Sequence, residues 1–165
     1  LTCKTSMSQR IYELTAVNPA INQFGAVRLL EEKDMPFFPF WEEAFHAATV
    51  YGQTQMSIPR DAEPYQYRLS TKKLYILEDK GIPVSMAGYT REMQTAVGVA
   101  FVYTPPYYRG KGYATSCVAQ ISRMALDKGF KRCVLYTDLL NPTSNHIYQE
   151  IGYRAVCDSL MLQFE

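Results

Sequence analysis

The alternation of hydrophobic and polar residues is most regular in the second half of the chain. Apolar runs that begin at Lys73, Val84 and Ala96 are separated by turn residues, which predicts three strands in an antiparallel meander. Apolar positions then recur at helical spacing over residues 111–128, and Gly129 provides a C-terminal stop. Next come a strand over 132–137, a helix from Asn141 to Gly152 and one or two strands over 153–164. This order predicts an α/β fold in which helices pack on a mixed sheet.

The first half is less regular, and residues 1–24 are typical of an arm. Residues 10–15 alternate as a half-buried strand does, and an Asn-Pro pair then breaks the pattern. The chain begins at Leu1 rather than Met, so this strand could be the end of a missing upstream domain. We therefore expect an N-terminal arm over 1–24 and one main domain over 25–165.

The main domain should begin with a short strand near residues 26–30. A helix is expected to follow, with Asp34 as its cap and with Pro39 delaying its first turn. Residues 50–71 are rich in Gln, Pro and Tyr, and they fit either a second short helix or a loop over a site. The sequence leaves both interpretations open.

Composition narrows the classes of protein. The chain has 165 residues, a length that suits one domain, and its hydrophobic content of 47% excludes bulk disorder. Its net charge of +1 gives no general field for nucleic acid or an anionic membrane, and no apolar run is long enough to span a bilayer. The four cysteines stand apart and lack metal-ligand spacing. We expect a cytoplasmic protein with no metal, no nucleic-acid partner and no membrane association.

A glycine-rich turn lies between the third predicted strand and the helix over 111–128. Tyr108-Arg109-Gly110-Lys111-Gly112-Tyr113-Ala114-Thr115 places two glycines and two cations where the backbone N–H groups of a helix N-terminus are unpaired. A phosphate or pyrophosphate suits such a turn. An ordinary strand-to-helix turn is the other interpretation, and the turn by itself leaves both open. The Walker loop and the dinucleotide fingerprint do not fit, because Gly112 and Thr115 stand where those motifs need other residues.

The same turn resembles the Arg/Gln-x-x-Gly-x-Gly/Ala signature of the GNAT superfamily of N-acetyltransferases, which holds the pyrophosphate of acetyl-coenzyme A. A second motif supports this resemblance. The segment from Asn141 to Tyr153 is similar to the family's Asn-x-x-Ala/Ser-x-x-x-Tyr helix, and it presents Asn141, Asn145 and Tyr148 on one helix face. The resemblance is good over residues 73–165 and fainter over 25–72. It implies the family's mostly antiparallel sheet, splayed between the strands near 96–104 and 132–137.

The resemblance implies acetyl transfer from acetyl-CoA to a primary amine, carried by a small molecule or a peptide, by direct attack in a ternary complex. It makes Tyr148 the catalytic residue, facing the leaving sulfur. The residues that it assigns to the cofactor are Val102, Tyr103, Thr104, Arg109, Gly110, Lys111, Gly112, Tyr113, Ala114, Thr115, Asn141 and Asn145. The acceptor should be set by residues 34–72 and by the loop near Glu92. No general base can be singled out, and the final strand could pair between chains to form a homodimer.

Two competing interpretations remain. The first is a non-catalytic module of the same fold that binds acyl-CoA or supports a larger protein, and the odd N-terminal strand favours it. The intact turn, Asn141 and Tyr148 weigh against it, because a degenerate copy need not keep them. The second is another phosphate-dependent enzyme that uses a nucleotide, which the missing Walker and dinucleotide residues disfavour.

Overall fold

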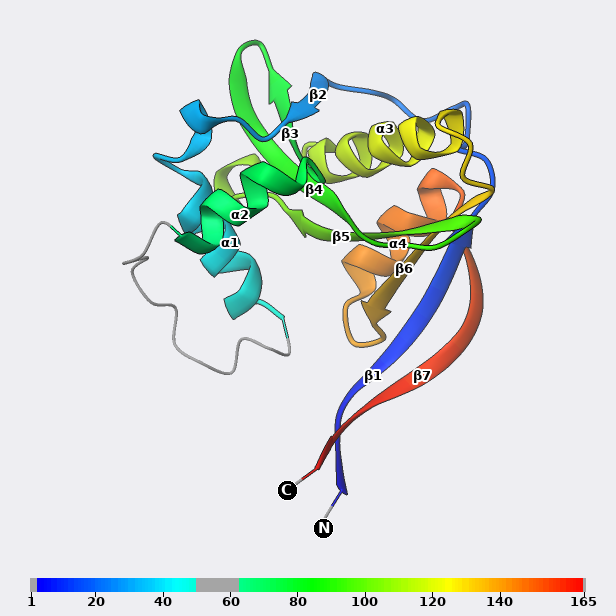
Figure 1. Ribbon diagram of the computed structural model, residues 1–165. Helices are drawn as coiled ribbons and strands as arrows, with labels where there is room; N and C mark the ends of the chain where they lie inside the picture. The colour runs from blue at the N-terminus through cyan, green and yellow to red at the C-terminus, as the bar shows by residue number, and fades with distance from the viewer. Residues whose placement is uncertain (1–2, 50–62, 165) are drawn as a thin grey trace.

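The computed structural model describes residues 3–49 and 63–164 (Figure 1). Its strands are β1 (Cys3–Leu14), β2 (Ala26–Leu29), β3 (Leu74–Asp79), β4 (Ile82–Glu92), β5 (Ala96–Tyr103), β6 (Arg132–Asp138) and β7 (Arg154–Phe164). Its α-helices are α1 (Phe38–Ala47), α2 (Glu63–Thr71), α3 (Tyr113–Asp127) and α4 (Pro142–Ile151), with short 3-10 helices at Glu32–Asp34 and Pro106–Tyr108. The strands form one seven-stranded mixed sheet in the order β2-β3-β4-β5-β6-β1-β7. The predicted α/β class is confirmed.

The elements predicted for the second half are all present, and their ends agree to within about two residues. The last segment forms the single strand β7. In the first half, Asp34 does not cap α1, whose N-cap residue is Phe37. The Asp34 carboxylate is instead buried, where it accepts two hydrogen bonds from Arg28, at 2.7 and 2.8 Å, and one from the Glu31 backbone N–H. Of the open stretch 50–71, residues 63–71 are the helix α2, and 50–62 lie outside the described residues.

Strand β1 lies inside the sheet, although it comes from the segment that the sequence predicts as an arm. It pairs antiparallel with β6 on one side and with β7 on the other, so that Ile11 faces Tyr136 and Cys157 across the two ladders. The strand starts at Cys3, earlier than predicted. Residues 3–9 pair with β7 but lack a regular apolar alternation, so the sequence pattern does not reveal them as a strand. A domain boundary at residue 24 stays a prediction, but the strand itself completes the sheet.

Helices cover the two faces of the sheet unequally (Figure 1). One core, under α3 and α4, takes its side chains from β1, β3, β4, β5 and β6 and includes Tyr12, Leu77, Val97 and Leu135. A second core, under α1 and α2, includes Phe38, Ile76 and Met86 and covers the β2–β5 half of the opposite face. Among the described residues, no helix is both long enough and apolar enough to cross a membrane.

The sheet opens between its two parallel strands. β5 and β6 pair only at Ala96–Arg132, Val97–Cys133 and Gly98–Val134, and they separate beyond that point. A bulge in β5 accounts for the separation. The β4–β5 register shifts by one residue around Phe101, which has a φ of +57°. This bulge bends β5 away from β6, and the predicted splay is confirmed.

Candidate functional site

The splay leaves one edge of β5 without a neighbouring strand. Tyr103 still pairs with Met86 of β4, so the groups that lost a partner are those directed toward β6. Thr104 follows the strand, and its hydroxyl lies 2.9 Å from the buried Ser85 hydroxyl. The stretch Val102–Tyr103–Thr104 is therefore fixed from the β4 side. On the β6 side it offers the edge of a strand to an extended ligand.

The glycine turn lies immediately beyond this edge and begins helix α3. Gly110 and Gly112 have φ values of +71° and +80°, and Gly112 is the N-cap residue of the helix. A Cβ atom at Gly112 would come within 3.1 Å of the Phe24 ring. A side chain here would meet both a left-handed backbone and a close neighbour, which explains the glycine in physical terms.

The turn presents a row of unpaired backbone donors. The N–H of Arg109 donates to the Pro106 carbonyl at 3.2 Å, and the first helical bond of α3 runs from Ser116 to Gly112 at 2.9 Å. Between them, the backbone N–H groups of residues 110–115 have no acceptor in the part of the chain that the structure describes. Together with the positive end of the helix dipole, such a row suits a phosphate or pyrophosphate.

The two cations of the turn lie beside it. The Arg109 side chain donates to the Thr104 carbonyl at 2.9 Å and lies over the Tyr103 ring, with 5.9 Å between Cζ and the ring centroid. The Lys111 ammonium lies 4.7 Å from the centroid of the exposed Tyr107 ring. Both charges add to the positive field at the turn without occupying the backbone site.

Beyond Gly98 and Val134 the strands β5 and β6 are separated, and we call the space between them the slot. Helix α4 brings the residues of the second motif to the β6 side of this slot. Asn141 caps the helix, since its Oδ1 accepts the Ser144 N–H at 3.0 Å. The amide of Asn145 is engaged within the protein: Oδ1 accepts from Tyr12 at 2.9 Å, and Nδ2 donates to the carbonyls of Asp138 at 3.0 Å and Asn141 at 2.7 Å. A cofactor role for Asn141 and Asn145 stays a prediction, and the structure shows what holds each of them.

Tyr148 is packed between two other tyrosines. Its ring centroid lies 6.4 Å from that of Tyr12 and 6.0 Å from that of Tyr153, and its side chain is largely buried. Burial raises the pKa of Tyr148 to about 12. Within the described residues no group hydrogen-bonds the Tyr148 hydroxyl, so its proton is available to a ligand. A neutral hydroxyl with a free donor is suited to stabilising negative charge at a leaving atom.

Tyr12 is the residue of this site that the sequence does not single out. It is fully buried on β1, and its hydroxyl donates to Asn145 and accepts from Gln149 at 3.3 Å. The alternation of residues 10–15 predicts that Tyr12 and Leu14 share a face. It carries no signal that this face meets a helix more than 130 residues away.

Other reactive side chains do not join the slot. Cys117 is buried on α3, and burial raises the pKa of its thiol to about 12, so it stays protonated as a packing residue. Two of the acidic side chains are paired with cations: Glu42 pairs with Arg68 at 2.6 Å, and Glu92 pairs with Lys73 at 3.1 Å. No group of His, Cys, Asp and Glu residues that could hold a metal ion occurs among the described residues.

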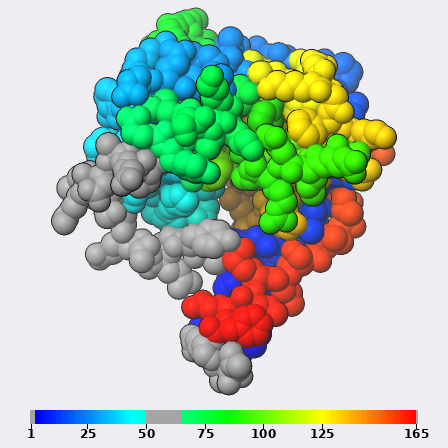
Figure 2. All heavy atoms as spheres, in the orientation of Figure 1, coloured from blue at the N-terminus to red at the C-terminus, as the bar shows by residue number. Residues whose placement is uncertain are grey.

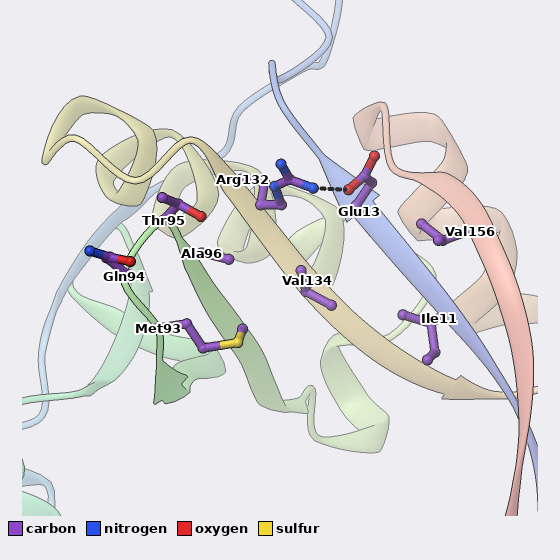
Figure 3. Close-up of a pocket in the computed structure, with 9 residues that line it drawn as sticks. All are labelled: Ile11, Glu13, Met93, Gln94, Thr95, Ala96, Arg132, Val134 and Val156. Atoms are coloured by element: carbon purple, nitrogen blue, oxygen red, sulfur yellow. Dashed lines mark hydrogen bonds and ion pairs between the residues drawn. The ribbon is translucent and has the colours of Figure 1, made fainter.

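A groove of about 500 Å³ lies on the opposite face of the sheet from α3 and α4, at the end where β5 and β6 are still paired (Figure 3). Ile11, Val134 and Val156 give it apolar walls, and the Glu13–Arg132 ion pair, at 3.2 Å, crosses it. The β4–β5 turn after Glu92 forms its other side through residues 93–95. Figure 2 shows this face of the molecule hollowed between α1 and β7, with β6 at depth.

Comparisons with known proteins agree with this geometry. The family model described as "Acetyltransferase (GNAT) family" matches residues 28–153. A search of curated proteins found no match. Among solved structures, a GNAT-family acetyltransferase from Colwellia psychrerythraea superposes with a TM-score of 0.68 at 15% identity, covering 99% of this chain and 57% of its own. A GCN5-related N-acetyltransferase from Kribbella flavida gives 0.65 at 16% identity, covering 97% and 59%.

A shorter neighbour matches over most of its own length. The N-acetyltransferase from Staphylococcus aureus Mu50 gives a TM-score of 0.60 at 17% identity, covering 76% of this chain and 80% of its own. At these identities the structural likeness shows the fold. This chain spans less than two thirds of the Colwellia and Kribbella proteins.

Proposed function

Because the chain belongs to the GNAT acetyltransferase family, we propose that it transfers an acetyl group from acetyl-CoA to a primary amine by direct attack in a ternary complex. The observation that carries this proposal is the row of unpaired backbone N–H groups over 110–115 at the end of the splayed β5 edge. An anion-binding turn continuous with a free strand edge fits a ligand that joins a pyrophosphate to an amide-bearing arm.

The pyrophosphate would bind at the glycine turn. Its oxygens would accept the N–H groups of residues 110–115, with Lys111 and Arg109 supplying charge from the sides. The N–H of Arg109 is already given to Pro106, so the backbone site starts at Gly110. Tyr113 directs its hydroxyl away, to Asp79 at 2.7 Å, and this hydrogen bond raises the pKa of Tyr113.

The pantetheine arm would extend along Val102–Tyr103–Thr104 and pair with the free edge of β5 as an added strand does. The thioester would then lie near the bulge at Phe101. A backbone N–H freed by the splay could donate to the thioester oxygen as negative charge develops there. The edge thus serves both to place the arm and to stabilise the oxyanion.

The amine nitrogen would attack the thioester carbon, the carbon–sulfur bond would break, and the CoA thiolate would leave. Tyr148 would donate a hydrogen bond to that sulfur. With a phenol pKa of about 12 against about 8.5 for a thiol, full proton transfer from Tyr148 is uphill by roughly 5 kcal/mol. Tyr148 therefore acts best as a neutral donor, and the thiolate takes its proton from water after it leaves.

The acceptor would approach from the hollowed face in Figure 2, where β6 separates from β5. The groove beside this opening includes the turn after Glu92 and has apolar walls, so it offers space for the body of a small amine or a peptide. The Glu42 and Glu92 carboxylates are already paired with cations, and Asp138 at the end of β6 accepts the Leu140 backbone N–H at 2.8 Å. We propose that the amine loses its proton to water.

Thermal unfolding with acetyl-CoA, CoA, ATP and NAD in separate samples tests cofactor binding. A ligand at about 100 times its Kd adds about 2.7 kcal/mol of stability, which raises Tm by roughly 5–10 °C for a domain of this size. We expect this rise with acetyl-CoA and CoA only. A rise with ATP or NAD alone would contradict the proposal.

Release of free CoA from acetyl-CoA, measured over a panel of small amines and N-terminal peptides, tests transfer. We expect at least one amine to accelerate release above the rate of hydrolysis. Binding of acetyl-CoA without acceleration by any amine would favour a non-catalytic acyl-CoA-binding module of the same fold.

A further inference from the structure

Strand β1 places one polar atom deep in the core beside the candidate catalytic helix. The Tyr12 side chain is fully buried, and its hydroxyl contacts two residues of α4: it donates to Asn145 Oδ1 at 2.9 Å and accepts from Gln149 Nε2 at 3.3 Å. Asn145 and Gln149 are one helical turn apart, so the hydroxyl spans the turn on which Tyr148 lies. Filling the core needs only the ring, and a phenylalanine would do that.

Asn145 extends this contact to the end of β6. Its Nδ2 donates to the carbonyls of Asp138, the last residue of β6, and Asn141, the cap of α4. The hydroxyl of Tyr12 holds the other end of the same amide. One half-buried amide thus joins three segments: β1, the end of β6 and the first turn of α4. The β6 end is one wall of the slot.

Tyr148 lies against the same tyrosine. The Tyr12 and Tyr148 rings meet at an angle of 54° with 6.4 Å between their centroids. A displacement of the first turn of α4 would therefore move Tyr148 relative to the slot, even with the core still packed. Positioning of a donor matters steeply in catalysis, because a shift of about 1 Å can cost about 10²-fold in rate.

We propose that Tyr12 is a positioning residue for the reaction: through Asn145 it fixes α4 so that the Tyr148 hydroxyl faces the leaving sulfur. This inference rests on the proposed acetyl transfer. The proposed role of Tyr12 means that the N-terminal strand β1 contributes to the function of the site. Tyr12 itself touches neither the cofactor nor the amine.

The first test compares Tyr12→Phe with Tyr89→Phe. Tyr89 is a matched control because its buried hydroxyl donates to the Ile121 carbonyl of α3, away from α4. Tyr12→Phe loses the hydrogen bonds to Asn145 and Gln149. Tyr89→Phe loses the one to Ile121, and both variants should show a loss in Tm. We expect Tyr12→Phe to lower kcat about tenfold with the KM for acetyl-CoA within about twofold of wild type, and Tyr89→Phe to keep the wild-type kcat. Equal kcat values in the two variants would overturn the inference.

A double variant separates positioning through Asn145 from a general loss of packing. If Tyr12 acts only through Asn145, Tyr12→Phe combined with Asn145→Ala should be no slower than Asn145→Ala alone. Multiplication of the two single losses would overturn the inference, since it would mean that the two residues act independently.

Hydrogen exchange provides a readout that needs no acceptor. In Tyr12→Phe, amides of the peptide covering 141–151 should exchange several times faster than in wild type, while those of α3 keep their rates. In Tyr89→Phe, the 141–151 peptide should be unchanged. Unaltered exchange in Tyr12→Phe would overturn the inference. Failure of the wild type to acetylate any amine would instead count against the proposed function, and exchange would still decide whether Tyr12 holds α4.

Discussion

The two walls of the proposed slot are built by different means. The glycine turn is made within a few consecutive residues, and the groups it offers are backbone N–H groups of residues 110–115. The α4 wall offers a side chain, Tyr148, and that side chain is held by residues from the other end of the chain. A backbone site depends on local conformation, whereas a side-chain site depends on the packing of distant elements.

This difference also separates binding from chemistry. A backbone site with flanking cations suits an anion that is the same in every reaction cycle. The α4 wall must instead hold one hydroxyl in a fixed relation to a bond that breaks, and small displacements there cost rate rather than affinity. Variants of the first wall should therefore change cofactor binding, and variants of the second should change turnover.

The largest effect is expected from Gly112→Asp. The new carboxylate would lie beside the turn that binds the pyrophosphate, and two like charges about 4 Å apart at an effective dielectric constant of 20 repel by about 4 kcal/mol. Its Cβ would also press on the Phe24 ring. We expect acetyl-CoA to bind about 10³-fold more weakly, measured by isothermal titration calorimetry.

Gly129→Asp is the matched control for this variant. Gly129 follows the other end of α3, has a φ of +106° and leaves open space for a Cβ atom. An aspartate there also occupies a positive-φ position and adds the same charge away from the turn, so Tm should fall while acetyl-CoA affinity stays within about twofold. Equal affinities for Gly112→Asp and wild type would remove the turn from the binding site.

The second effect is expected from Tyr148→Phe. The ring would keep its packing between Tyr12 and Tyr153, and only the donor would be lost. We expect kcat to fall about 10²-fold, the typical size for one catalytic donor, with acetyl-CoA affinity unchanged. The measurement is steady-state CoA release together with a binding titration.

Tyr75→Phe serves as its control, because Tyr75 is equally buried and its hydroxyl faces Lys128 at the far end of α3. It should keep the wild-type kcat. A Tyr148→Phe variant as fast as Tyr75→Phe would show that Tyr148 has only a packing role.

The same contrast explains how far the sequence could be interpreted without the structure. The glycine turn and the start of α4 were predictable because each follows from residues close together in the chain: Gly112 as a left-handed N-cap and Asn141 with its Ser144 contact. The splay was expected only from the resemblance to the family. The position of β1 between β6 and β7 was not, because alternation over residues 10–15 identifies a strand without its neighbours.

Asp34 shows the second limit. An acidic residue before an apolar helix is a reasonable N-cap, and nothing local distinguishes that role from a buried ion pair. Arg28 of β2 decides between the two roles, because its guanidinium donates two hydrogen bonds to the Asp34 carboxylate. The internal partner of Asn145 escaped the sequence for the same reason, since the hydroxyl that donates to its Oδ1 comes from Tyr12, 133 residues away.

The smallest effect concerns the dependence of the rate on pH, and it tests the protonation state of Tyr148. We expect no descending limb at high pH. Tyr148 can donate only while protonated, and burial raises its pKa to about 12, so the donor is retained at every pH below that value. The rate should therefore rise with pH as the acceptor amine loses its proton and should not fall again up to about pH 10.5. An unshifted tyrosine, with a pKa near 10, would by contrast lose about half of its donor by pH 10.

Profiles of kcat/KM for wild type and Tyr148→Phe should have the same shape and differ only in height. A descending limb with a midpoint near 10 that occurs in wild type and disappears in Tyr148→Phe would mean that the phenol titrates at its ordinary pKa and that burial does not keep it protonated in the free enzyme.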